Sequence, residues 1–208
     1  MNNKSIIPSP VVVTYPVKRA AASHPYEYRY PSLATLGSKA GVTCSVDVAV
    51  RCGKAGEIRG YATFEEAAQA LKQGVVSALL VPAAYPNAYQ FIQDADLRCD
   101  RVFIMRIPAL VLAGKGERPP RFAIALLHHP ATKPLLSDVE LHYGRAIEVQ
   151  SNAAAAEMVA NEDAGHCLAI TNGLCAAHYG LSVYKILRSG VEMPWLVFVP
   201  ARRTNSQN

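Results

Sequence analysis

The stretch TFEEAAQALKQGVVSALLVP, residues 63–82, decides the class of fold. It opens with a capping box, in which the side chains of Thr63 and Glu66 can each bind a free backbone N–H at the start of a helix. Apolar residues at helical spacing follow and give the helix one buried face, and a glycine ends it. The near-continuous apolar run at residues 75–81 is typical of a strand buried on both faces. The stretch therefore predicts a helix that leads into a central strand of an α/β fold.

Short strands and capped helices alternate on both sides of this stretch. Strands are predicted at residues 32–37, 59–62, 75–81, 101–107, 110–113, 122–127, 146–149, 167–170, 183–187 and 195–199, and helices at 46–52, 63–73, 153–159 and 173–179, with another beginning at Pro130. The alternation favours an α/β architecture with mostly parallel sheets. The looser sequence after Pro82 divides it into two lobes. In such a fold, a ligand cleft lies at the carboxyl ends of the strands.

The predicted organisation has an arm, two lobes and a tail. Residues 1–31, rich in Pro and Tyr, form an extended arm, and residues 204–208 form a frayed tail. Residues 32–103 together with 188–203 make the first lobe, and residues 104–187 make the second lobe.

Composition excludes several classes of protein. Half of the 208 residues are hydrophobic and 18% are charged, which excludes a wholly disordered chain. No apolar run approaches the ~20 residues that span a bilayer, and the first residues lack the continuous apolar segment of a secretory signal. The net charge of +5 comes from scattered Lys and Arg residues rather than from a basic stripe. We therefore expect a cytoplasmic protein with no nucleic-acid and no membrane partner.

Metal and cofactor motifs are missing from the sequence. The five cysteines include no pair at zinc-site spacing, and we interpret them as reduced thiols. His128 and His129 are adjacent at a strand end, so their side chains point to opposite faces and chelate poorly. The sequence has no glycine-rich nucleotide-binding motif and no Gly-x-Ser-x-Gly elbow. We therefore expect neither a metal nor a cofactor.

Small hydroxyl and amide residues stand at three strand-to-helix junctions, Thr43-Cys44-Ser45, Ser151-Asn152 and Thr171-Asn172. Helix N-termini present free N–H groups and the positive end of the helix dipole, so such junctions can bind carboxylates or phosphates. For any single junction, ordinary helix capping is the better explanation. If the three junctions face one cleft, they predict a small polyanion as the ligand.

One ordered series of short motifs runs through the chain. It consists of Thr35-Leu36-Gly37, Thr43-x-Ser45, Thr63-Phe64, Val81-Pro82, His129-Pro130, Ser151-x-x-Ala154-Ala155, Ala169-Ile170 and His178-Tyr179-Gly180-Leu181. Over residues 32–200 this series resembles the prephenate dehydratase fold. The resemblance implies two α/β lobes of the periplasmic-binding-protein type around a cleft that holds prephenate. It also implies a homo-oligomer, either a dimer or a tetramer.

The departures from that fold resemble a different subfamily. The dehydratase Thr-Arg-Phe motif, whose Thr is thought to protonate the leaving hydroxyl, is replaced by MPWLVF at residues 193–198. The dehydratase Pro-Ile-Glu-Asn element is replaced by PAAY at residues 82–85. With Thr171-Asn172 and Tyr179-Gly180-Leu181, these stretches are similar to the prephenate decarboxylases of bacilysin-type antibiotic pathways. The resemblance implies that prephenate loses its ring carboxylate as CO2 and keeps its 4-hydroxyl, which gives a dihydro-4-hydroxyphenylpyruvate.

The same resemblance implies roles for individual residues. It points to Tyr85, His129 and Thr171 as catalytic residues and to a dicarboxylate substrate. The implied substrate-binding residues are Thr43, Ser45, Arg106, Ser151, Asn152, Asn172 and Trp195, with Lys39 as another source of positive charge and Met193 as a second shield for the ring. A surface position for Arg106 or Lys39, and a core position for Trp195, remain open.

Three further departures keep more than one function open. The first loop, residues 37–43, is two residues longer than in the decarboxylases, Asn152 replaces a Thr, and His128 replaces a Ser. The substrate could therefore be a related ring acid, such as one of a tropone-type pathway. A dehydratase-like enzyme that uses a different acid, for instance His129, is also compatible with the sequence. So is a non-catalytic protein that binds a small acid.

Overall fold

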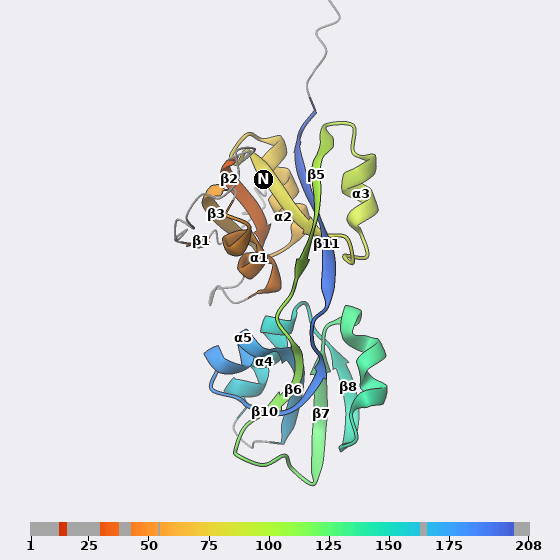
Figure 1. Cartoon of the computed structure of the whole chain (residues 1–208). Coiled ribbons are helices and arrows are strands. Elements are labelled where there is room, and N and C mark those ends of the chain that lie inside the picture. The colour runs from red at the N-terminus through yellow and green to blue at the C-terminus, as the bar shows by residue number, and fades with distance from the viewer. Residues whose placement is uncertain (1–12, 16–29, 38–42, 54, 163–165, 202–208) are drawn as a thin grey trace, which may run out of the picture.

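The computed structural model describes residues 13–15, 30–37, 43–53, 55–162 and 166–201. The chain forms two α/β lobes, one above the other in Figure 1, and each lobe is built on one sheet. The two-lobed α/β class predicted from the sequence is confirmed. Lys39, the tail at residues 204–208 and most of the predicted N-terminal arm lie outside the described residues.

The first lobe is a six-stranded sheet with helices on both faces. Its strands, in spatial order, are β1 (Val13–Tyr15), β3 (Ala55–Tyr61), β2 (Tyr30–Leu36), β4 (Ala78–Pro82), β11 (Glu192–Pro200) and β5 (Leu97–Arg106). Helix α1 (Cys44–Cys52) covers one face, while α2 (Phe64–Lys72) and α3 (Ala88–Gln93) cover the other. The central strand β4 is therefore buried on both sides, as its apolar sequence predicts.

The second lobe is a five-stranded sheet, also covered on both faces. Its strands, in spatial order, are β10 (Ser182–Arg188), β6 (Leu110–Gly114), β9 (Cys167–Asn172), β7 (Phe122–His128) and β8 (His142–Glu148). Helices α4 (Asn152–Asn161) and α5 (Gly173–His178) pack on one face. The 3-10 helix η1 (Pro130–Asp138) contributes Leu135 to the core on the other face.

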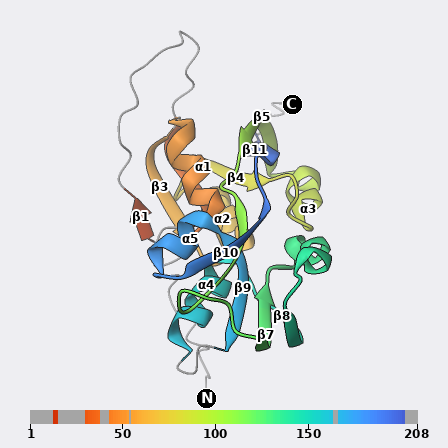
Figure 2. The ribbon, with the colours of Figure 1, turned by 60° about the horizontal axis from the view of Figure 1, so that its bottom comes forward.

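The chain crosses between the lobes twice. Strand β5 leads into β6 through residues 107–109, and β10 returns to β11 through residues 189–191. Figures 1 and 2 show β5 and β11 side by side, and their antiparallel register runs from Arg106–Glu192 to Leu97–Pro200. The predicted lobe boundaries at residues 103/104 and 187/188 therefore fall within β5 and β10, because both strands continue toward the connection.

The prediction of mostly parallel sheets is only partly right. In the first sheet, β2 is parallel to β3 and β4, but β11 is antiparallel to both of its neighbours. In the second sheet, β7 is parallel to β8 and β9, but β6 is antiparallel to both of its neighbours. Strands β6 and β11 thus run against the βαβ strands of their sheets, and the order of elements in the sequence does not reveal this direction.

Several elements differ from their predicted form. Strand β4 begins at Ala78 rather than at Val75, because the Val75 N–H still donates to the Ala70 carbonyl and closes the end of α2. The helix that begins at Pro130 is a 3-10 helix, and Pro134 inside it lacks the N–H that a regular α-helix needs. Helix α3 and strand β1, which lies within the predicted N-terminal arm and pairs with β3, are elements that the sequence did not predict.

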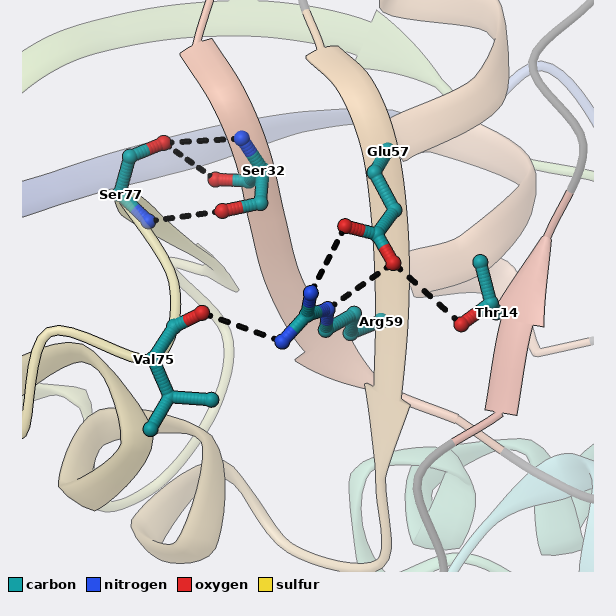
Figure 3. A network of polar contacts seen from close by, with 6 residues as sticks. All are labelled: Thr14, Ser32, Glu57, Arg59, Val75 and Ser77. Atoms are coloured by element: carbon teal, nitrogen blue, oxygen red, sulfur yellow. Dashed lines mark hydrogen bonds and ion pairs between the residues drawn. The ribbon is translucent and has the colours of Figure 1, made fainter.

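A network of polar contacts ties the outer strands of the first lobe together (Figure 3). Arg59 donates to the two carboxylate oxygens of Glu57 at 3.0 and 2.9 Å and to the Val75 carbonyl at 3.1 Å. Ser77 donates its hydroxyl to the Ser32 carbonyl at 2.6 Å and accepts the Ser32 N–H at 2.9 Å. These contacts fix β2 and β3 relative to the segment that leads into β4.

Candidate functional site

A cavity of about 420 Å³ lies between the two lobes. Both lobes line it, and residues of the connection, Ile107 and Val191, close it further. The volume falls in the range of about 300–1,000 Å³ that is typical of sites for small molecules. The cleft that the sequence predicts between the lobes is thus present, and it is the candidate site.

Two helix N-termini from opposite lobes meet at this cavity. At α1, Thr43 Oγ1 accepts the Val46 N–H at 3.1 Å and donates to the Leu36 carbonyl at 2.8 Å. At α4, Ser151 Oγ accepts the Ala154 N–H at 3.0 Å. The first residues of both helices line the cavity: Cys44 and Ser45 of α1, and Asn152 and Ala153 of α4. Both positive helix ends therefore favour an anion in the space between them.

The hydroxyl of Ser45 is available to a ligand. Ser45 is only 4% exposed and lines the cavity, and its hydroxyl has no hydrogen-bond partner among the described residues. Thr43, by contrast, uses its hydroxyl as both donor and acceptor within the protein. Of these two predicted binding residues, Ser45 offers a side chain to a ligand, while Thr43 holds the start of the helix in place.

The third predicted junction does not face the cavity. Thr171 and Asn172 are fully buried and do not line it. Thr171 Oγ1 donates to the Asn152 carbonyl at 2.6 Å, and Asn172 Oδ1 caps α5 by accepting the Cys175 N–H at 2.8 Å. Asn172 Nδ2 also donates across the lobes to Cys44 Sγ at 3.4 Å. These residues support the cavity wall from behind, so direct substrate contact does not fit their positions.

The third helix N-terminus at the cavity is that of α2 rather than that of α5. Thr63, Phe64 and Glu65 line the cavity, and the predicted capping box is present, since Thr63 Oγ1 accepts the Glu66 N–H at 3.0 Å. Its second bond differs, because Glu66 accepts the N–H of Ala62 at 3.2 Å. The sequence analysis identified this helix start as a fold signal and missed its place at the site.

Tyr85 lines the cavity together with a carboxylate that sequence reasoning missed. Its hydroxyl donates to Glu65 Oε1 at 2.7 Å, and its ring packs against Phe64 with centroids 4.7 Å apart. Burial, followed by the hydrogen bond to Glu65, raises the pKa of Tyr85 to about 12, while the Asn87 side chain acts in the opposite direction. The phenol therefore keeps its proton at neutral pH.

His129 also lines the cavity, and its ring has a defined role in η1. Its Nδ1 accepts the Ala131 N–H at 3.2 Å, which places the proton of the neutral ring on Nε2. Burial, followed by the charge of His128, lowers the pKa of His129. At neutral pH the ring is thus an uncharged hydrogen-bond donor rather than a cationic acid.

Strand β11 supplies an apolar wall. Met193 and Trp195 both line the cavity, and Trp195 is 1% exposed. Trp195 Nε1 and Asn152 Oδ1 are buried, and neither atom has a hydrogen-bond partner in the described part of the chain. Trp195 is therefore both a core residue and a wall residue, so the two expectations for it are compatible.

No Lys or Arg side chain appears among the described residues that line the cavity. Arg106 lies at the end of β5 with an exposed side chain, 3.7 Å from Glu192, and is not part of the wall. Cys44 lines the cavity as a neutral group, because burial raises the pKa of that thiol to about 12. Positive potential in the described wall thus comes from backbone N–H groups rather than from side chains.

Comparisons with known proteins identify the fold. No protein-family model and no curated protein matches the chain. A prephenate dehydratase from Arthrobacter aurescens, solved in complex with L-Phe, matches with a TM-score of 0.64 and 17% identity over 85% of this chain and 62% of that chain. GqqA, described as a novel type of quorum quenching acylase, matches with a TM-score of 0.56 and 18% identity over 83% and 65%. A prephenate dehydratase from Staphylococcus aureus matches with a TM-score of 0.56 and 14% identity over 83% and 68%.

These similarities show that the chain has a prephenate dehydratase-like fold, as the ordered series of motifs implies. The chain spans slightly less than two thirds of the length of the first two structures. In the described ranges, no helix is long and apolar enough to cross a membrane. Nor do three or more His, Cys, Asp or Glu side chains gather there in an arrangement that could hold a metal ion.

Proposed function

We propose that the protein decarboxylates prephenate without aromatising the ring, in specialised metabolism of the antibiotic type. The product is a dihydro-4-hydroxyphenylpyruvate. The observation that carries this proposal is the convergence of the α1 and α4 N-termini, with the free hydroxyl of Ser45, on one cavity between the lobes. The proposal includes the cytoplasmic location and the homo-oligomeric state implied by the resemblance to the prephenate decarboxylases.

The two helix N-termini suit the two carboxylates of prephenate. Ser45 and the first N–H groups of α1 serve one carboxylate, while Ser151 and the first N–H groups of α4 serve the other. Each helix end contributes about 0.3–2 kcal/mol toward binding a negative group, depending on its burial. Two such ends on opposite lobes select a dianion of limited length over a monoanion.

The apolar wall favours loss of the ring carboxylate. Decarboxylation needs no nucleophile; the bond from the ring carbon to the carboxylate breaks, CO2 leaves, and the electron pair spreads over the ring diene. Trp195 and Met193 exclude water from one side of the cavity. The ring carboxylate, held by one helix end and shielded from water on the side of this wall, is less solvated than in bulk water and loses CO2 more readily, while binding of the other carboxylate holds the substrate in place.

The ionisable groups of the described wall are compatible with retention of the hydroxyl. They are Cys44, Glu65, Tyr85 and His129, and the pKa shifts keep the thiol and the phenol protonated and the imidazole neutral at pH 7. A general acid that protonates a leaving group contributes about 10²–10⁴-fold to a rate. The dehydratase Thr is absent, and the Tyr85 proton is donated to Glu65, so no proton of this phenol is directed at the 4-hydroxyl. A ring carbon takes a proton from solvent instead, and water is not lost.

Acyl-group hydrolysis, the activity that the name quorum quenching acylase gives to GqqA, fits this site less well. Such chemistry needs an activated nucleophile, and the raised pKa of Cys44 leaves its thiol protonated. The Ser151 hydroxyl accepts a backbone N–H as an ordinary helix cap.

The experiment that tests the proposed function is product analysis. Purified protein is incubated with prephenate, and the products are identified by NMR and mass spectrometry against a no-enzyme control. The variant Ser137→Ala, an exposed change in η1 away from the cavity, serves as a matched protein control. A product that has lost CO2 and kept its hydroxyl supports the proposal. Phenylpyruvate as the sole product, or unchanged prephenate, contradicts it.

A further inference from the structure

Glu65 and Tyr85 form a hydrogen-bonded polar pair at the cavity. The phenol of Tyr85 supplies the one proton between the two groups. Glu65 lies in the first turn of α2, and Tyr85 follows the end of β4. The Tyr85 Oη to Glu65 Oε1 distance is 2.7 Å, and both residues line the cavity. The pair is independent of the two helix N-termini that we assign to the carboxylates.

The direction of this hydrogen bond decides what Tyr85 can offer a ligand. An ionised carboxylate only accepts hydrogen bonds, so the proton between the two groups belongs to the phenol. Tyr85 has one O–H, and the bond to Glu65 uses it. The oxygen of Tyr85 can then act toward a ligand only as an acceptor.

Aromatic packing holds the phenol in this orientation. The Tyr85 ring lies 4.7 Å from the Phe64 ring and is stacked at 6.2 Å on the ring of Phe91. Phe64 and Phe91 are both buried in the core of the first lobe. The ring therefore has little freedom to turn its hydroxyl away from Glu65.

We infer that the Glu65–Tyr85 pair recognises a hydroxyl group on the ligand as a hydrogen-bond donor, with Tyr85 as the contact and Glu65 as the positioning residue. This inference rests on the proposed function where it identifies that group as the 4-hydroxyl of the prephenate ring. A hydroxyl that donates to Tyr85 receives no proton from it. Its C–O bond stays intact while the ring carbon is protonated.

Removing the carboxylate allows the polarity of Tyr85 to reverse. In Glu65→Gln, the amide can donate to the phenol oxygen, and the freed O–H can turn toward the ligand. The phenol then donates to the ligand hydroxyl, the direction that assists departure of water. We therefore expect the share of phenylpyruvate among the products to rise about tenfold in Glu65→Gln, which is less than the roughly 10²–10⁴-fold effect of a fully placed general acid.

A binding experiment tests hydroxyl recognition without turnover. Calorimetry compares 4-hydroxyphenylpyruvate with phenylpyruvate, two unreactive compounds that differ by one hydroxyl. We expect the wild-type protein to bind the hydroxylated compound about fivefold more tightly, the value of one net hydrogen bond. Tyr85→Phe and Glu65→Gln should each lose this preference. Tyr89→Phe, an exposed change on α3 outside the cavity wall, should keep it.

The two experiments separate failure of this inference from failure of the proposed function. If the preference is present but prephenate is not decarboxylated, hydroxyl recognition stands and the proposed reaction is wrong. If prephenate is decarboxylated with its hydroxyl retained, but the wild type binds both compounds equally or binds neither, the pair does not recognise a hydroxyl. An unchanged product ratio in Glu65→Gln, with normal folding, also overturns the inference.

Discussion

Replacing Ser45 by Ala should separate ligand binding from folding stability. Ser45 is a largely buried residue that lines the cavity, and its hydroxyl has no partner in the described part of the protein, so the folded state loses no internal hydrogen bond in Ser45→Ala. Because no internal hydrogen bond is lost, the free energy of unfolding should stay within about 1 kcal/mol of the wild-type value.

The effect on activity should be large. A hydrogen bond to a charged group contributes about 1.5–3 kcal/mol, and about 1.4 kcal/mol corresponds to a factor of ten. If Ser45 holds a carboxylate of prephenate, kcat/KM should fall about 10- to 150-fold in Ser45→Ala. Initial rates measured by NMR give kcat/KM, and urea denaturation without ligand gives the free energy of unfolding.

Ser77→Ala is the reciprocal control. Ser77 makes hydrogen bonds of 2.6 and 2.9 Å with Ser32 in the first lobe and does not line the cavity (Figure 3). This variant should lose about 1–2 kcal/mol of stability and keep its kcat/KM. If Ser45→Ala instead lowers stability while its kcat/KM stays within twofold of wild type, the hydroxyl is structural and the carboxylate site at α1 is wrong.

Three further predictions concern Trp195, Arg106 and His129. Trp195→Ala should lower the free energy of unfolding by about 3–5 kcal/mol in urea denaturation, since Trp195 is buried between β4 and β5; a loss below about 1 kcal/mol would contradict its core position. Arg106→Gln should leave kcat/KM for prephenate within twofold of the wild-type value, because the Arg106 side chain is exposed outside the cavity wall; a tenfold loss would show that Arg106 takes part in substrate binding. The lowered pKa of His129 means that the unfolded chain binds a proton before the folded protein does, so stability should fall as the pH decreases below 6.5. His129→Gln should flatten this part of the stability profile, and an unchanged slope would show that His129 is not its cause.

The sequence predicts local features well where one short stretch contains the whole signal. Thr63 and Glu66 define the start of α2, and Thr43 and Ser151 define the starts of α1 and α4, because each cap acts on N–H groups two or three residues away. The apolar run that contains β4 is likewise interpretable without its neighbours. Two of the three strand-to-helix junctions that carry small hydroxyl or amide residues line the cavity between the lobes.

The remaining features depend on contacts between distant parts of the chain. Glu65 and Tyr85 are 20 residues apart, and they meet only because α2 packs beside the end of β4. Thr171-Asn172 has the same residue types as the other junctions, but the register of β9 buries both side chains behind the wall. Arg106 is one of several exposed cations, and only the position of β5 shows that it points away from the cavity.

The place of β11 in the first sheet has a consequence for the order of folding. This strand lies between β4 and β5, so the sheet of the first lobe is incomplete until residues 192–200 have been synthesised. The Pro82–Trp195 pair joins positions 113 residues apart, whereas β6 to β10 of the second lobe form one continuous segment. Contacts of such long range form late, because the intervening chain must first be brought together. On the ribosome, the second lobe should therefore fold first. Until β11 is synthesised, the edges of β4 and β5 that pair with it stay unpaired, and a chaperone can bind them.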